Sequence, residues 1–259
     1  MEPMPESNLS FWEHLDELRS VLLKSLSAWL VASLAAFFFK KQLFACLFAP
    51  TRSCFILYRA LSYLARITGW EAMRPDGVEV HFLNTELTAQ FMTHIQVSLF
   101  TGLILAMPMV VFWLYEFVAP AMGEQTKRVS ATLILGSVLL FAAGVCLNYF
   151  LIFPLSFRFL VTYQVTSLVV NQISLSSYIS LFLVMSLLMG LFFELPLMTW
   201  ILSRMGILNR DVLMRYRKHV FVAILILAAV ITPTGDPFTL LLVTLPVYLL
   251  YELSIHIIR

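Results

Sequence analysis

The sequence predicts an all-α integral membrane protein with six transmembrane helices, and three observations support this fold class. Hydrophobic residues make up 60% of the 259 residues and charged residues only 12%, whereas soluble domains average about 45–50% and 25%. Several apolar runs approach the roughly 20 residues that a helix needs to cross a bilayer. Short polar segments with proline and glycine separate these runs. We therefore expect one polytopic membrane domain over residues 1–259, without internal repeats.

The first four spans follow from the positions of the long apolar runs. They are expected over residues 21–39, 93–118, 131–153 and 175–203. Pro108 is expected to kink the second span, and Pro154 to end the third. Residues 40–92 are too polar to span a membrane, and we expect a long ordered loop with short helices over 42–48 and 54–67.

Two shorter apolar runs, residues 219–231 and 238–255, complete the six spans. Residues 232–237, rich in proline and glycine, form a turn between them. A helix of about 13 residues covers roughly 20 Å, less than the hydrocarbon core of about 30 Å. We therefore expect the last two helices to be short, so that they thin the bilayer or leave a hollow beside their neighbours.

The distribution of basic residues predicts the orientation of the chain. Six spans place both termini on one side, together with loops 119–130 and 204–218, which carry most of the basic residues of the short loops. The short loops on the other side contain only Arg158. The loop 40–92 carries six basic residues, but long loops count less in the positive-inside rule. We expect cytoplasmic termini and an outer 40–92 loop.

An amphipathic helix with an acidic face is expected just before the first span. Ser10 and Glu13 have the spacing of a capping box, and Glu13, Asp16 and Glu17 lie opposite the apolar face of the helix. Anionic lipids at a membrane surface favour basic residues, so these acids do not help anchoring. The residues alone leave two interpretations open, an ordinary solvated face or a site for a positively charged partner.

Glu194 is expected near the middle of the bilayer. It precedes Arg204 by ten residues, about 15 Å along a helix and half of a core of about 30 Å. A charged group there costs on the order of 2.5–3.5 kcal/mol. One interpretation is a neutral acid bonded to a carbonyl freed beside Pro196. The other, which we favour, is a functional contact or polar path within the bilayer. Asp236, in the last turn, is expected to cap the sixth helix.

Several function classes are excluded by what the sequence lacks. It contains no metalloprotease, nucleophile-elbow, Walker or dinucleotide-binding motif, so we predict no enzymatic activity and no cofactor. The three cysteines have no metal-ligand spacing, and we predict no metal site. A net charge of +2 gives no indication of a nucleic-acid partner.

Seven short fragments, in order, resemble the TatC component of the twin-arginine protein translocase along nearly the whole chain. They are HLDELR at 14–19, AP at 49–50, FVAPA at 117–121, FELP at 193–196, TPTGDPF at 232–238, LP at 245–246 and LYE at 250–252. The resemblance implies six helices in a concave, glove-like arrangement. It also implies recognition of signal peptides with two consecutive arginines, and export of folded proteins driven by the proton-motive force.

Further expectations follow from the same resemblance. The partners would be twin-arginine signal peptides, single-span TatA- and TatB-type subunits, further copies of the chain, and membrane lipid. The absence of a transit peptide favours the bacterial inner membrane over the thylakoid, with a multi-pass topology.

The resemblance also assigns roles to individual residues. Glu17, flanked by His14 and Arg19, is the acid implied in arginine recognition, and Glu194 is the intramembrane acid implied in partner contact. The remaining motif positions have structural or outer-turn roles: Pro50, Phe117, Pro120 and Asp236. The sequence departs from the family where a second recognition acid is expected, because Thr126 occupies that position. Our hypothesis is that Glu124, two residues earlier, replaces it.

A proton-coupled small-molecule transporter, with Glu194 as proton carrier, is the alternative function. It would explain a buried acid. It would not explain the acidic N-terminal helix, the short final spans or the absence of internal repeats.

Overall fold

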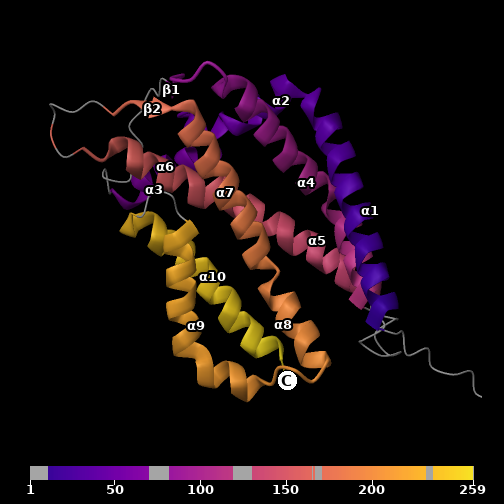
Figure 1. The fold of residues 1–259 in the computed structure, drawn as a ribbon. Coiled ribbons are helices and arrows are strands. Elements are labelled where there is room, and N and C mark those ends of the chain that lie inside the picture. Colours follow the sequence, from indigo (N-terminus) through magenta and orange to yellow (C-terminus); the bar gives the residue numbers. More distant parts are fainter. Residues whose placement is uncertain are drawn as a thin grey trace, which may run out of the picture.

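The computed structural model describes residues 11–69, 82–118, 130–164, 166, 171–231 and 236–258. Within these ranges the chain is almost entirely helical (Figure 1). The helices are α1 (Phe11–Phe37), α2 (Lys40–Leu47), α3 (Ile56–Thr68), α4 (Ala89–Val118), α5 (Ser130–Leu147), α6 (Phe153–Thr162), α7 (Leu175–Phe193), α8 (Leu195–Arg204), α9 (Arg210–Ile231) and α10 (Pro237–Ile257). The sequence had not indicated the short parallel pair of strands β1 (Phe82–Leu83) and β2 (Ile173–Ser174).

Five helical segments of the described chain are long and apolar enough to cross a membrane: Leu15–Phe37, Ala89–Phe117, Ala131–Thr162, Leu175–Arg204 and Pro237–Ile257. They match expected spans one to four and six. Helix α9 lies where the fifth span was expected, and its apolar half follows a charged first half. With 22 and 21 residues, α9 and α10 are only slightly shorter than Leu15–Phe37. At 1.5 Å per residue each covers about 32 Å, so the expected length of roughly 20 Å was too small.

Helices α1 and α4 form an antiparallel pair on one side of the molecule, and α9 and α10 lie on the other, with α5 and α7–α8 between them (Figure 1). The indole N–H of Trp29 donates to the Leu99 carbonyl (2.8 Å), linking α1 to α4. At the C-terminal end of α1, the His94 ring stacks on Phe37 with centroids 4.0 Å apart. Helix α4 continues through Pro108.

The third span does not end at Pro154, contrary to expectation. A π-helical turn, Asn148–Ile152, follows α5 and continues directly into α6, which extends to Thr162. The N–H of Phe153 bonds to the carbonyl of Asn148, five residues back. Pro154 then lies in the first turn of α6, where a missing N–H is tolerated. The change of hydrogen-bond register therefore lets the helix pass through the proline.

The basic segment 204–218 is also less irregular than expected, because α9 begins at Arg210. Asp211 lies in the first turn of α9, where its charge complements the helix dipole. Leu213 is buried, so this charged half of the helix has a packed face. Only residues 205–209 connect α8 and α9.

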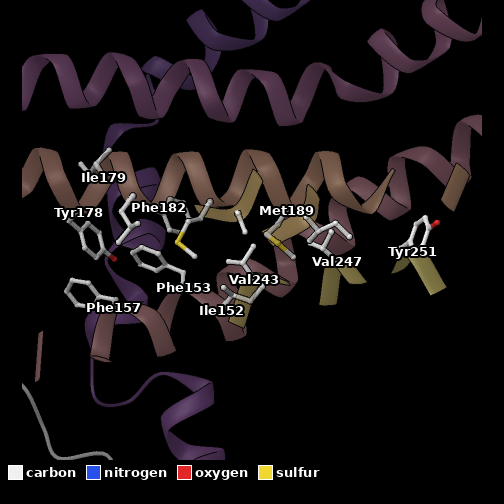
Figure 2. Packing of buried hydrophobic residues seen from close by; sticks show 14 of the residues in the cluster. Ile152, Phe153, Phe157, Tyr178, Ile179, Phe182, Met189, Val243, Val247 and Tyr251 are labelled. Carbon is white, nitrogen blue, oxygen red and sulfur yellow. The ribbon is translucent and has the colours of Figure 1, made fainter. Parts of the chain in front are cut away.

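Short helices α2 and α3 lie close to the expected ranges 42–48 and 54–67 within the long 40–92 segment. A 3₁₀ turn, Ala49–Thr51, follows α2 and contains the buried Pro50. A cluster of buried hydrophobic residues lies where the π turn, α6, α7 and α10 meet (Figure 2). Aromatic rings fill one end of it, with Phe153 and Phe157 edge-on to Tyr178.

Candidate functional site

The acidic end of α1 lies at the same end of the molecule as the end of α4. Glu17 is half-buried in the second turn of α1, and Arg19 is exposed. Measured from the Trp29–Leu99 contact of the antiparallel pair, Glu17 lies 12 residues away and Phe117 lies 18 residues away in the same direction. At 1.5 Å per residue, Phe117 is about 9 Å beyond Glu17 along the axis. The fold therefore brings Glu17 and the half-buried Phe117 to one end of the α1–α4 pair.

Some of the expected site residues lie outside the described part of the chain. Helix α4 ends at Val118 and α5 begins at Ser130, and the segment between them contains Pro120, Glu124 and Thr126. The expected capping box lies outside the described residues as well, as does the side chain of His14, whose backbone belongs to the first turn of α1.

Glu194 is buried where the fourth span breaks into α7 and α8. Pro196, in the first turn of α8, has no N–H and cannot complete the helical hydrogen bond to residue 192. Ser137 of α5 donates a hydrogen bond to Oε1 of Glu194 (2.8 Å), and its own side chain is buried. Glu194 is 7% exposed, and its described partner is a side chain of another span, not a carbonyl beside Pro196.

Helices α5 and α7 run antiparallel and pack closely beside Glu194. A Cβ added at Gly144 would lie 2.3 Å from the Met189 carbonyl oxygen. A second polar pair lies beyond this contact, where Asn148 donates to the Ser186 hydroxyl (2.8 Å). Both members of this pair are fully buried. Two polar pairs therefore flank a close glycine contact along the same interface.

Pro50 is positioned by hydroxyl groups from the spanning segments. The Tyr178 hydroxyl of α7 donates to the Leu47 carbonyl (2.8 Å), and the Tyr149 hydroxyl of the π turn donates to the Cys46 carbonyl (2.9 Å). Carbonyls in the last turn of a helix have no partner within it. The two phenols therefore satisfy the end of α2 and fix the turn that contains Pro50.

Asp236 caps α10, as the sequence predicted. Its Oδ1 accepts a hydrogen bond from the backbone N–H of Thr239 (2.7 Å). The next aromatic ring, Phe238, stacks on Phe159 of α6 with centroids 4.5 Å apart. Asp236 and Phe238 thus begin α10 against the end of the third span.

An ion pair that the sequence had not indicated links the last two helices. The guanidinium of Arg217 in α9 donates two hydrogen bonds to the carboxylate of Glu252 in α10, in a bidentate arrangement. The sequence predicts Arg217 only as one charge of a basic loop. Two features of the sequence could have indicated this pair. Glu252, the last residue of the LYE fragment, is an acid in an otherwise apolar helix, and the preceding antiparallel helix begins with basic residues.

The described residues show no grouping suited to a metal ion, since no three His, Cys, Asp or Glu side chains lie close enough together among them.

Comparisons with known proteins agree in family and fold. The model of the family described as Sec-independent protein translocase protein (TatC) matches residues 13–246. The TatC protein of Blattabacterium sp. subsp. Periplaneta americana is 31% identical over 255 residues, which cover 97% of this chain and 96% of the relative. The TatC protein of Deinococcus radiodurans is 32% identical over 261 residues, which cover 100% of this chain and 90% of the relative.

Two crystal structures described as the twin arginine translocase receptor TatC have the same fold. One superposes with a TM-score of 0.75 at 32% identity and covers 94% of this chain and 97% of that chain. The other, determined in DDM, superposes with a TM-score of 0.77 at 33% identity and covers 95% of this chain and 100% of that chain. The expected fold class, an all-α membrane protein, is confirmed, and the helix arrangement is consistent with six spans. The chain belongs to the TatC family of Sec-independent protein translocase proteins.

Proposed function

We propose that this subunit of the Sec-independent translocase binds twin-arginine signal peptides at the end of the molecule where α1 begins and α4 ends. The observation that carries the proposal is the position of Glu17, a half-buried acid at the same end as Phe117. Two solved structures of the same fold are described as twin arginine translocase receptors.

The chemistry of the two side chains fits this role. A carboxylate can accept two parallel hydrogen bonds from one guanidinium, and lysine cannot reproduce that fork. Partial burial lowers the local dielectric constant and so strengthens the attraction between Glu17 and a bound arginine. His14 and Arg19 flank this acid on α1 and would contact the peptide around its arginine pair.

Two arginines require a second acceptor, and we assign it to Glu124. The segment that contains Glu124 follows α4 directly and therefore starts at the end of the molecule where Glu17 lies. Phe117, in the last turn of α4, and Pro120 would fix the direction in which this segment leaves the helix. Pro50 would hold the turn after α2, whose end is fixed by the carbonyl contacts described above.

Glu194 serves a different step in this proposal. It is a buried acid at a helix break, so a single-span TatA- or TatB-type subunit with a polar group at the same depth could bind it within the bilayer. Assembly with these subunits and with further copies of the chain would export folded proteins, driven by the proton-motive force. The N- and C-termini would face the cytoplasm of a bacterium, and the chain would lie in the inner membrane.

Crosslinking of a signal peptide tests the assignment of Glu17. A peptide with a photoreactive residue beside its Arg-Arg pair should crosslink to the wild-type chain, and a Lys-Lys peptide should not. Glu17→Ala should weaken peptide binding by about 10- to 100-fold, because a hydrogen bond to a charged group contributes roughly 1.5–3 kcal/mol. Glu17→Asp should lose less, since the charge remains.

Glu86→Ala is the matched control, because Glu86 is an exposed acid just before α4, at the opposite end of the α1–α4 pair. It should crosslink like the wild type. Equal crosslinking of Glu17→Ala and wild type would remove Glu17 from the site. The same assay tests Glu124, for which Glu124→Ala should lose crosslinking and Thr126→Ala should not.

The burial of Glu194 also favours the alternative, a proton-coupled small-molecule transporter. The two functions differ in what Glu194→Gln should affect. In the translocase, this change should reduce co-purification of the single-span subunits and export of folded cargo. A transporter would instead show proton uptake into vesicles that contain this chain alone, and Glu194→Gln would abolish it.

A further inference from the structure

Helix α9 has one face that no other described helix covers. The helix packs chiefly against α10 at the margin of the fold (Figure 1). Its buried positions Leu213, Ile224 and Ala228 face inward. The Tyr251 hydroxyl of α10 donates to the Leu213 carbonyl (2.8 Å) on this packed side. The opposite side of α9 is therefore open to the membrane.

Basic and apolar side chains follow one another along this open face. Arg215 and Lys218 are three residues apart and share one face of the helix. Val222 and Ile226 continue the same face at intervals of four residues, and all four side chains are exposed. Lys218 lies about 6 Å from the level of Val222, at 1.5 Å per residue. Two cations thus lie directly above an apolar stripe.

The neighbouring end of α8 marks the level of the membrane surface. The guanidinium of Arg204 lies over the Trp200 ring, 5.2 Å from its centroid. Tryptophan and arginine are typical of the interface between hydrocarbon and water. Only residues 205–209 separate Arg204 from the first residue of α9, so the charged half of α9 begins at this level.

The two cations are available to a ligand. Glu252 binds Arg217, but no hydrogen bond or ion pair of Arg215 or Lys218 is found within the described part of the chain. Asp211 is exposed four residues before Arg215 and is the one acid of α9. Since Arg210 lies beside it, the open face keeps a net positive charge.

We propose that Arg215 and Lys218 bind the phosphate of an anionic phospholipid, whose acyl chain lies along Val222 and Ile226. A phosphodiester accepts charge-assisted hydrogen bonds from guanidinium and ammonium groups. A free phosphate would use the two cations but not the apolar stripe. An acidic peptide would have to place polar backbone against Val222 and Ile226. The two cations match the phosphate of a lipid, and the apolar side chains that follow them match its acyl chain.

Lipid binding to the full-length chain in neutral detergent tests the proposal. The protein is titrated with dioleoylphosphatidylglycerol or dioleoylphosphatidylcholine, and bound lipids are counted by native mass spectrometry. The wild type should retain phosphatidylglycerol preferentially. The double variant R215Q/K218Q should bind it roughly 25-fold more weakly, since each basic residue at an anionic lipid surface contributes about fivefold. Phosphatidylcholine binding should not change.

The variant K40Q/K41Q removes the same charge from two exposed lysines at the start of α2 and should bind phosphatidylglycerol like the wild type. An equal loss in both double variants would show a general effect of net charge and overturn the site. Absence of a preference for phosphatidylglycerol in the wild type would overturn it too. Displacement of the lipid by inorganic phosphate at equal concentration would identify a phosphate site in place of a lipid site.

Discussion

Ser137 donates a hydrogen bond to Glu194 across the interface between α5 and the break of the fourth span, and both side chains are buried. The two residues are 57 positions apart in the chain. A buried acid with a donor adopts one orientation, whereas the same acid without a donor loses that interaction and keeps its desolvation cost. The direction in which Glu194 presents its carboxyl group therefore depends on Ser137.

Ser137→Ala should lower the free energy of unfolding by about 1–3 kcal/mol, because Glu194 then remains buried without this donor. It should also reduce co-purification of a single-span partner subunit if Glu194 is the contact. Ser137→Thr keeps the hydroxyl and should restore partner binding. Unfolding in detergent and affinity co-purification measure the two effects. Ser27→Ala, at an exposed serine of α1, is the control. Partner binding by Ser137→Ala at the wild-type level would contradict the positioning role.

Gly144→Ala should destabilise the contact between α5 and α7. A Cβ at this position would lie 2.3 Å from the backbone oxygen of Met189 and 2.9 Å from the Phe193 ring. The backbone cannot yield as a flexible side chain can, and overpacking of this kind costs typically about 1–3 kcal/mol. Thermal unfolding in detergent should show the loss.

Gly136→Ala provides the matched control, since Gly136 lies in the same helix and nothing lies within 4 Å of its added Cβ. Alanine is the better helix former by about 1 kcal/mol, so Gly136→Ala should be neutral or stabilising. Equal destabilisation by both changes would mean that the close α5–α7 approach does not limit stability.

Local patterns predicted those parts of the fold that depend on nearby residues. Apolar runs located the spans, and an acid before a proline and an apolar segment located the cap at Asp236. The distance from Glu194 to Arg204 predicted its depth in the bilayer, but not which neighbours would bury it. Each of these inferences needs only nearby residues, standard helix geometry or the thickness of a bilayer, and none needs a contact between distant parts of the chain.

Features that depend on distant residues could not be predicted in the same way. The third span passes Pro154 because the Asn148–Ile152 turn changes its hydrogen-bond register, in a segment packed against α7 and α10. The charged half of α9 is helical although its local sequence suggested a loop, and Arg217 is bound by Glu252, 35 residues later. Local patterns do not contain these contacts, nor the donor of Glu194.

Tyr178→Phe should loosen the 40–92 segment while leaving the spanning helices folded. The change removes the hydroxyl that donates to the Leu47 carbonyl and leaves a buried acceptor without that bond, at a cost of about 1–3 kcal/mol. Hydrogen exchange of α2 and protease cleavage within 40–92 should both become faster.

Tyr163→Phe is the corresponding control, because Tyr163 is exposed just after α6. It should leave both rates unchanged. If hydrogen exchange and protease cleavage of the Tyr178→Phe variant kept their wild-type rates, the Tyr178 hydroxyl would not be the group that fixes the turn at Pro50.

Arg217 and Glu252 predict a charge-swap experiment on the last two helices. Arg217→Glu places two acids together and should lower the midpoint of thermal unfolding in neutral detergent, as should Glu252→Arg. The double change R217E/E252R restores opposite charges and should recover part of the loss. Arg217→Lys should be intermediate, because an ammonium keeps the charge but not the bidentate geometry that the two hydrogen bonds show.

Arg215→Glu is the control for this series, since Arg215 lies two residues earlier on α9 and has no ion pair within the described chain. In detergent without anionic lipid it should leave the midpoint unchanged. A double variant less stable than both single variants would show that the two side chains act independently. Recovery in the double variant, together with a neutral Arg215→Glu, would locate the stabilising charge contact between α9 and α10 at this pair, because only a direct interaction makes the effect of one charge depend on the other.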